Sequence, residues 1–484
     1  MSKNTAIQTP TTRTERKRIG KVLRRQVPLA GHSQWTSAAD RPDPLALLQA
    51  QDQGRVKQLL PLKYGRMLES PFTFYRGSAV LMAADLAGTP ATGLEAVLCG
   101  DAHLSNFGVF ATPERRMVFD INDFDEAFPG PWEWDLKRLA ASAVIAGRDN
   151  GFNEKSCRQL AEDTTLTYGR AMDRFCQMTT LEHWYYHVDV EAVLQAFEEQ
   201  SSKKAHKDAK KMVKKARTKT QEQTLEKLTR LEDGQRRITS NPPLLVPFRE
   251  MNLEQHLSKA DMKQLSEQGV ARTWDQYLAS LPDERRYLLQ RYQLSDGALR
   301  VGGIGSVGTR CAIVLLKGGA EDDALILQLK EAGPSVLEAY VDYRSPYESH
   351  AQRVVTARRL MQATSDIFLG WSRGAHTGVN YYWRQLKDMK GSADIARLDE
   401  SGLRVYLGVC SWCLARAHAR TGDGVQIRGY LGTKDAFAKA IGDFAVAYAD
   451  QAEQDYKALV KAVKDGRIAT ETGIYDGCPR LSWT

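Results

Sequence analysis

The chain has 484 residues, which is enough for a large core and for two or three lobes. Its hydrophobic content of 42% and charged content of 26% are those of an ordinary soluble globular protein, and no apolar run approaches the ~20 residues that crossing a bilayer requires. A net charge of +8 allows contact with phosphate-rich partners but does not by itself indicate one.

The N-terminal segment is polar and basic and lacks the apolar core of a secretory signal. We predict that residues 1–40 form a disordered basic tail, because they contain few apolar side chains. Seven cysteines, an odd number scattered along the chain, indicate free thiols in a reducing compartment. The expected location is therefore the cytoplasm, and no membrane partner is expected.

Two helical segments are predicted before the first group of polar motifs. Apolar residues recur at helical spacing over residues 42–60 and again over residues 79–86. Arg66 and Arg76 lie shortly before those motifs. Either arginine could face them, although a structural ion pair is the simpler interpretation for each.

The first group of motifs reads Gly-Asp-Ala-His-Leu-Ser-Asn from Gly100 to Asn106 and follows an apolar run. An acidic cluster, Asp-Ile-Asn-Asp-Phe-Asp-Glu from Asp120 to Glu126, follows a second apolar run. Loops at strand ends often carry chemistry, because the scaffold holds them while their side chains stay free. The oxygen atoms gathered here suit a hard cation, and an aspartate can accept the proton of a hydroxyl.

This order of residues, with Asp-Leu at Asp135 further on, resembles the catalytic segment of kinase-like phosphotransferases, above all the aminoglycoside phosphotransferases. In such enzymes the loop aspartate orients the acceptor hydroxyl, while an asparagine and a second aspartate hold magnesium on the nucleotide phosphates. The resemblance implies Asp101 as base, Asn106 and Asp123 as metal ligands, and Asp135 as a buried brace under the loop.

Two points of this assignment stay open. The span between the asparagine and the metal-binding aspartate is a few residues longer than in the related family, so Asp120 or Asp125 is an alternative metal ligand. His103 is a further candidate for the catalytic site, as a contact to the transferring group or as a metal ligand.

The middle of the chain is predicted to be helical and then highly charged. Helical spacing continues through residues 136–175, and residues 191–233 form a charged segment that predicts an exposed helical arm. Residues 205–245 contain no aromatic side chain on which a base could stack, so no specific nucleic-acid partner is expected. Asn-Pro-Pro at residues 241–243 marks a lobe boundary.

The second group of motifs contains a glycine-rich turn, Gly-Gly-Ile-Gly-Ser-Val-Gly from Gly302 to Gly308. A dinucleotide-binding turn would open a helix. Here an apolar, β-branched run (residues 311–316) follows, and then a short turn and another strand-like run. A glycine turn between strands is typical of the phosphate-covering loop of kinases. The predicted nucleotide contacts are Gly303, Gly305, Ser306 and Gly308.

Lys330 ends the third of these predicted strands, where the kinase-like family has its phosphate-binding lysine. The alternative is an edge lysine that points to water. A buried lysine needs an anionic partner to stay charged. Glu348, at the start of an apparent helix over residues 347–363, is the first candidate for that partner and Glu338 is its rival.

The remaining segments complete a kinase-like set. Residues 366–371 and 381–386 predict two more strands, giving a five-stranded sheet whose last strand could carry an adenine-binding hinge. Residues 405–420 predict a helix with Leu-Ala-Arg-Ala-His-Ala ending at Ala419. That sequence is similar to the helix that precedes the catalytic loop in the family, yet here it lies far downstream of the loop.

We therefore predict an α+β protein with a bilobal, protein-kinase-like fold in circularly permuted order. A larger helical lobe (residues 41–240) carries the catalytic and metal loops and the charged insert. A small antiparallel lobe (residues 241–395) binds the nucleotide, and C-terminal helices (residues 396–484) complete the helical lobe. The two groups of motifs should then meet across one cleft.

The chain as a whole also resembles a bacterial family known as domain of unknown function 2252. The resemblance rests on Ser-Pro-Phe-Thr-Phe-Tyr-Arg-Gly from Ser70, on Asn-Asp-Phe-Asp-Glu in the acidic cluster and on Gly-Ser-Val-Gly-Thr-Arg from Gly305. It implies no substrate.

The expected activity is transfer of a phosphoryl group from ATP, with Mg²⁺, to a hydroxyl of a small-molecule acceptor. Three alternatives remain: a nucleotide-binding regulator without catalysis, a nucleotidyltransferase, and a metal-dependent phosphoesterase. The phosphoesterase set shares Gly-Asp-x-His but also needs an Asn-His pair, which the sequence lacks. The sequence does not indicate the acceptor or the oligomeric state.

Overall fold

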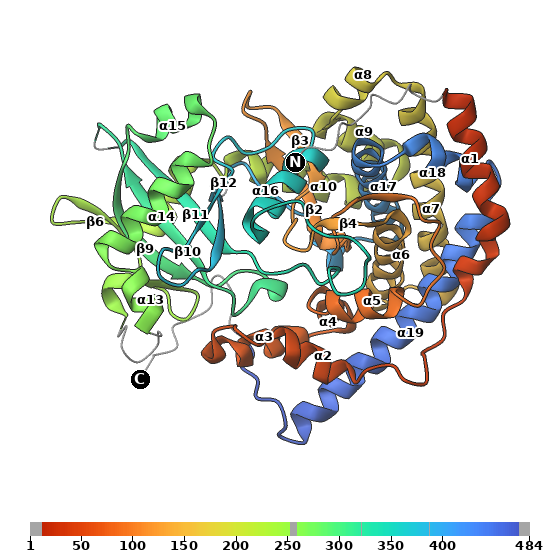
Figure 1. Ribbon diagram of the computed structural model, residues 1–484, viewed down its shortest axis with the longest axis horizontal. Coiled ribbons are helices and arrows are strands. Elements are labelled where there is room, and N and C mark those ends of the chain that lie inside the picture. Colours follow the sequence, from red (N-terminus) through yellow and green to blue (C-terminus); the bar gives the residue numbers. More distant parts are fainter. Residues whose placement is uncertain (1–11, 252–258, 321, 387, 474–484) are drawn as a thin grey trace, which may run out of the picture.

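The computed structural model describes residues 12–251, 259–320, 322–386 and 388–473. It confirms an α+β protein with antiparallel sheets. A large sheet with its own helices lies on one side of the molecule and a larger assembly of helices on the other (Figure 1). Among the described helices, none combines the length and the apolar content needed to cross a membrane.

The helical side is built around four long helices whose contacting faces are apolar. They are α6 (Trp132–Asp149), α7 (Glu154–Gln177), α17 (Glu400–Thr421) and α19 (Ala436–Lys464). Helix α6 is buried on nearly all sides, which explains why alanines and valines fill its central turns. The helices packed around this core are α2 (Pro44–Gln51), α3 (Leu60–Met67), α4 (Pro71–Arg76), α5 (Ala79–Leu86), α8 (Thr180–Tyr185), α9 (Val190–Gln200), α10 (Lys203–Thr218) and α18 (Gly424–Leu431).

The predicted disordered tail is wrong for residues 13–26 and 29–33, which are helical. Residues 13–26 form helix α1 (Arg13–Gln26), which lies along α18 at the outer edge of the helical side (Figure 1). Arg16 pairs with Asp423 at 2.7 Å, and Gly20 lets the two backbones approach closely. Composition favours disorder here, but the contacts that order the helix come from the far end of the chain. Residues 1–11 lie outside the described ranges.

Short strands hold the first group of motifs within the helical side. Strand β1 (Glu95–Leu98) pairs with β4 (Phe128–Pro131), and β2 (Phe107–Ala111) forms a hairpin with β3 (Met117–Ile121) that also pairs with β5 (Val188–Asp189). The loop from Gly100 to Asn106 connects β1 to β2, and the acidic cluster connects β3 to β4. Because these strands are neighbours, the two loops lie side by side.

The large sheet has six antiparallel strands in the order β12-β13-β11-β10-β9-β8, one strand more than predicted. The strands are β8 (Leu245–Pro247), β9 (Gln293–Arg300), β10 (Cys311–Lys317), β11 (Ala324–Glu331), β12 (Gly370–Arg373) and β13 (Asn380–Gln385). The predicted arrangement of strand, glycine turn, strand, turn and strand is confirmed in β9, β10 and β11.

Alternation along the strands gives the large sheet two different faces. Leu327 and Val314 point toward α14 (Glu267–Ala279), where Tyr277 stacks on Trp383 with ring centroids 4.5 Å apart. Helices α13 (Lys259–Gln264) and α15 (Asp283–Leu289) lie on the same side of the molecule as α14 (Figure 1). Lys330 belongs to the opposite face, which is turned toward the helical side.

The sheet region begins earlier than the predicted boundary at residues 241–243. Leu225 of α11 (Gln221–Leu228) and Ile238 of the β6–β7 hairpin (Thr229–Glu232 and Gln235–Ile238) are buried with Ile313 of β10. The chain therefore passes from the helical side to the sheet near residue 220. It returns beside this point, since the Met389 N–H donates to the Lys219 carbonyl at 2.9 Å. Helix α16 (His350–Met361) lies between the two sides.

Candidate functional site

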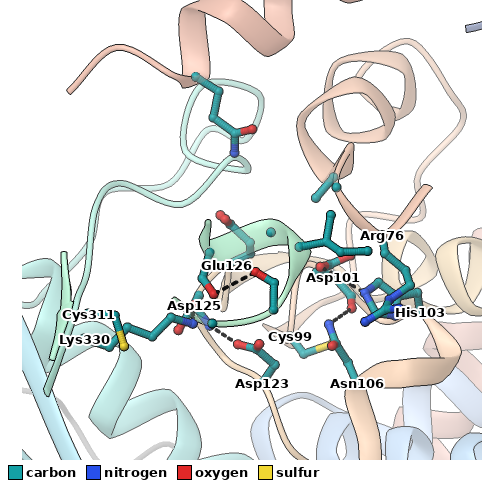
Figure 2. A pocket seen from close by; sticks show the side chains of 18 of the residues that line it. Arg76, Cys99, Asp101, His103, Asn106, Asp123, Asp125, Glu126, Cys311 and Lys330 are labelled. Carbon is teal, nitrogen blue, oxygen red and sulfur yellow. Dashed lines mark hydrogen bonds and ion pairs between the residues drawn. The ribbon is translucent and has the colours of Figure 1, made fainter. Parts of the chain in front are cut away.

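One cavity of about 210 Å³ joins the two groups of motifs. It lies between the large sheet and the loops of the helical side (Figure 2). The predicted meeting of these distant segments is therefore confirmed. The lining includes Arg76, Asp101, His103, Asn106, Asp123, Asp125, Glu126, Gly302, Gly303, Ile304, Gly305, Ser306, Cys311, Lys330 and Arg384.

The loop from Gly100 to Asn106 is held from below by Asp135, as predicted. Its carboxylate accepts the backbone N–H groups of Cys99 at 2.7 Å and Gly100 at 3.0 Å. Gly100 has a φ of +75°, and a Cβ at this position would lie 2.2 Å from the Glu126 carbonyl oxygen. Only glycine fits there without a shift. His418 is the histidine of the predicted Leu-Ala-Arg-Ala-His-Ala helix, now α17. Its Nε2 atom lies 3.3 Å from the Asp135 carboxylate, on the side opposite the loop.

Asp101 is an ionised carboxylate with two cationic or polar neighbours. Arg138 of α6 pairs with it at 2.5 Å, and His103 Nε2 lies 3.4 Å from its second oxygen. Burial would raise the pKa of Asp101, but Arg138 and His103 outweigh it and hold the pKa below its usual range. A carboxylate of this kind is suited to orienting a hydroxyl by accepting its hydrogen bond.

His103 is buried, and both of its ring nitrogens face protein groups. Nδ1 accepts the Ser105 N–H at 3.2 Å, so the ring proton belongs on Nε2, which faces Asp101. Burial lowers the pKa of His103 and favours the neutral ring. This arrangement suits a residue that positions Asp101, and it leaves no free nitrogen for the transferring group.

Of the three candidate acids for the metal, Asp123 has the fewest hydrogen-bond and ion-pair partners among the described residues. Asp120 gives both oxygens to Arg416 at 2.7 and 2.8 Å. Asp125 pairs with Lys330 through one oxygen and accepts the Tyr382 hydroxyl at 2.7 Å through the other. Asp123 accepts one bond, from the Asp125 N–H at 3.2 Å, and among the described residues nothing bonds its second oxygen.

Asn106 and Asp123 offer oxygen atoms to the same cavity. The Asn106 side-chain nitrogen donates to the Asp101 carbonyl at 2.7 Å, which leaves the amide oxygen without a partner among the described residues. Burial would raise the pKa of Asp123, but Lys330 and Arg384 lower it, so this carboxylate is charged. The described residues contain no cluster of three or more His, Cys, Asp or Glu that could hold a metal by itself. A magnesium ion here would therefore need oxygens from its substrate, as such ions commonly do.

Lys330 is buried on the face of β11 that borders the cavity. Burial would lower its pKa, but the pairing with Asp125 raises it well above the ordinary value, so the ammonium group is charged. Neither predicted partner is correct. Glu348 is exposed and lies ahead of the first turn of α16, and Glu338 pairs with His350 and Arg353.

Helix α16 supports the acidic cluster through an arginine instead of a glutamate. Arg353 is buried and donates to the carbonyls of Asp125 and Gly333, both at 2.9 Å, and also to the Ala127 carbonyl. The helix that was expected beside Lys330 is therefore present as α16. It contacts the backbone of the loop that contains Asp125, the partner of Lys330, and not Lys330 itself.

The glycine turn is fixed by two arginines, one between α2 and α3 and one in α3. Arg55 donates to the Gly305 and Val307 carbonyls at 2.9 and 2.6 Å, and Arg66 donates to the Gly302 carbonyl at 2.5 Å. With its carbonyls used in this way, the turn has N–H groups from Gly302 to Gly305 that find no acceptor among the described residues. Consecutive N–H groups without an internal acceptor are the kind of backbone group to which a phosphate can bind.

Three of the four predicted nucleotide contacts in the turn line the cavity, namely Gly303, Gly305 and Ser306. Gly308 does not. Its φ of +90° turns the chain toward β10, and its carbonyl accepts the Val56 N–H at 2.7 Å. Gly308 therefore shapes and anchors the turn, and the prediction of a direct contact is wrong for this residue.

Two basic residues of the site, Arg138 and Arg384, were not predicted from the sequence. Arg138 follows Asp135 by three residues, and this helical spacing puts both on one face of α6. Arg384 lies two residues beyond Tyr382 on β13, so strand alternation places it on the cavity face. Both spacings can be recognised in the sequence once the helix and the strand have been predicted.

A family model described as "Uncharacterized protein conserved in bacteria (DUF2252)" matches residues 55–462, a range that contains both groups of motifs. No curated protein and no solved structure matches the chain. The match covers most of the sequence, and so the chain belongs to the bacterial DUF2252 family.

Proposed function

We propose that the protein is an ATP-dependent phosphotransferase that acts on a hydroxyl of a small-molecule acceptor. One observation carries the proposal. A glycine turn with free N–H groups, a charged buried lysine and a carboxylate loop all line the same cavity. Anion-binding groups and a hydroxyl-orienting carboxylate, brought together in this way, are the parts that phosphoryl transfer requires.

In the proposed mechanism the triphosphate lies along the glycine turn and near Lys330. Asp101 accepts the hydrogen bond of the acceptor hydroxyl, while Arg138 and His103 keep the carboxylate ionised and oriented. Asn106 and Asp123 would hold magnesium, which supplies neutralisation of the phosphate charge. Positioning and charge compensation account for most of the acceleration in this class of reaction.

The ion pair between Lys330 and Asp125 gives the lysine a partner before the nucleotide arrives. Phosphate oxygens would share or replace this partner, and Tyr382 would still hold Asp125 by its hydroxyl. We infer that Asp125 keeps Lys330 extended across the cavity, which is the part that a helix glutamate plays in kinases.

We also propose that the fold is a circularly permuted form of the kinase-like fold. The support is the combination of a glycine turn between antiparallel strands, a lysine on the third strand, a helix between the sheet and the acidic cluster, and a buried histidine helix beneath the catalytic loop. The chain presents these parts with the catalytic loop first.

The test is nucleotide binding followed by product analysis. With Mg²⁺, wild-type protein should bind ATP, and Lys330→Met should weaken binding at least about tenfold, since charged hydrogen bonds contribute about 1.5–3 kcal/mol. Calorimetry measures this, with Lys317→Met at the exposed end of β10 as the matched control.

Release of ADP during turnover supports phosphoryl transfer, whereas release of pyrophosphate supports nucleotidyl transfer. Binding without either product supports a regulator. If wild-type protein binds no nucleotide with or without Mg²⁺, the proposed function is wrong.

A further inference from the structure

Arg76 occupies a place in the cavity that the mechanism above does not use. It is the last residue of α4 and lines the cavity between the catalytic loop and the glycine turn. The end of α4 packs against this turn, since a Cβ on Gly77 would lie 3.0 Å from Ile304. Figure 2 shows Arg76 beside Asp101 and His103, whereas Lys330 lies at the opposite end of the cavity.

In the part of the chain that the structure describes, the guanidinium group of Arg76 has no direct partner. Within the described residues no hydrogen bond or ion pair involves its side chain, and its buried Nε lacks an acceptor. The nearest catalytic carboxylate, Asp101, is already paired with Arg138, so Asp101 and Glu69 act on Arg76 only through space. Guanidinium groups stay charged in proteins, and a largely buried charge without a partner costs free energy. The site thus favours an anion that arrives with a ligand.

We propose that Arg76 binds the terminal phosphate of the nucleotide. This inference rests on the proposed function. A phosphoryl group that passes to a hydroxyl held by Asp101 must lie next to Asp101, and Arg76 is the unpaired cation at that end of the cavity. Its two terminal nitrogens can bind two phosphate oxygens at once, which fixes the group in line with the acceptor.

The transfer itself is balanced without any further reactant. The bond between the terminal phosphorus and the bridging oxygen breaks, and that oxygen leaves with ADP. A bond forms between the phosphorus and the acceptor oxygen, and the hydroxyl proton passes to Asp101 and then to water. Arg76 compensates the charge on the outer phosphate oxygens throughout.

The experiment compares two probes that differ by one phosphate. Calorimetry with Mg²⁺ measures the affinity of wild type, Arg76→Ala and Arg76→Lys for ADP and for the non-hydrolysable β,γ-imido analogue of ATP. Arg76→Ala should bind the analogue about tenfold more weakly and ADP within about twofold of wild type, as loss of a charged contact to one phosphate predicts. The affinity of Arg76→Lys for the analogue should lie between those of wild type and Arg76→Ala, because lysine keeps the charge but lacks the planar guanidinium group.

Arg116→Ala removes an exposed arginine far from the cavity lining and should change neither affinity. If Arg76→Ala weakens both probes equally, or neither, the assignment to the terminal phosphate is overturned while nucleotide binding stands. If wild type binds neither probe, the proposed function fails and this inference fails with it. Thermal unfolding of each variant identifies one that does not fold, and Arg76→Lys and Arg76→Gln then decide the question.

Discussion

Asp101 depends on its neighbours for the charge and the orientation that we assign to it. Arg138 and His103 approach it from two sides, and Asp135 fixes the backbone from which it projects. The site is thus built around one carboxylate whose pKa and direction are set by surrounding groups, so its chemistry can be removed without removing the cavity.

We predict that Asp101→Asn lowers the turnover rate by about 10²–10⁴-fold, the range that general acid–base groups contribute. Nucleotide affinity should stay within about threefold, because phosphate binding uses the glycine turn and Lys330. Rates of ADP formation and calorimetric affinities measure the two effects. Phosphorylation of the acceptor by the variant at the wild-type rate would contradict the role of Asp101.

Glu126 makes the stability of the folded protein depend on pH. Burial raises its pKa from 4.5 to about 7, while the Val336 N–H and Arg353 partly oppose the shift. The folded protein keeps this proton up to about pH 7, whereas the unfolded chain loses it near pH 4.5. Stability from this group is therefore complete below pH 4.5, falls as the pH rises toward 7, and levels off above that.

Glu126→Gln cannot ionise and should remove this loss. Between pH 5 and pH 8 the free energy of unfolding of the variant should rise by roughly 1–3 kcal/mol relative to that of wild type. The reason is that one unit of pKa difference between the folded and unfolded states corresponds to about 1.4 kcal/mol. Urea unfolding of both proteins at pH 5 and at pH 8 measures this difference in the free energy of unfolding. Glu95→Gln, at the exposed start of β1, is the control. Parallel pH profiles for wild type and Glu126→Gln would show that the folded protein does not hold the proton.

At the scale of elements, α1 is part of the folded helical side. A Cβ on Gly20 would lie 2.0 Å from the Gln426 carbonyl oxygen, well inside the contact distance. Gly20→Ala should therefore separate α1 from α18 and reduce the free energy of unfolding by about 1–3 kcal/mol, despite the better helix propensity of alanine.

Gly169→Ala in α7 is the matched control for this effect. The nearest atom to its added methyl group is 4.0 Å away, so helix propensity should act alone and increase stability by up to about 1 kcal/mol. Denaturant unfolding of both variants gives the comparison. Equal stabilisation by the two alanines would mean that α1 does not dock on α18 in solution.

The elements also show which contacts a sequence can reveal. Strand alternation correctly directs Lys330 toward the cavity, and helical spacing connects Arg138 with Asp135. The partner of Lys330 could not be found in this way, because Asp125 belongs to a loop 205 residues away, and nothing local distinguishes it from Glu348. Docking of α1 was missed for the same reason, since its binding surface is encoded near the C-terminus.

For the molecule as a whole, the class of fold and the convergence of the two groups of motifs were predictable. The class of fold follows from short-range patterns of apolar helices and strands, whereas the convergence follows from the resemblance of the two groups of motifs to parts of kinase-like phosphotransferases. The boundary of the sheet region was not predictable, because Leu225 lies in a charged segment that was predicted to be an exposed arm, and Ile238 follows that segment closely. The charged residues of such a segment indicate its exposed face but do not reveal that its other face packs against the sheet.

The hydrogen bond between Met389 and Lys219 has a consequence for motion. The stretch that enters the sheet near residue 219 and the stretch that leaves it near residue 389 lie against each other at this point. A movement of the sheet relative to the helical side would have to bend both stretches together, and it would also disturb α16, which lies between the two sides. Movement of the glycine turn itself would require Arg55 and Arg66 to give up their hydrogen bonds to its carbonyls.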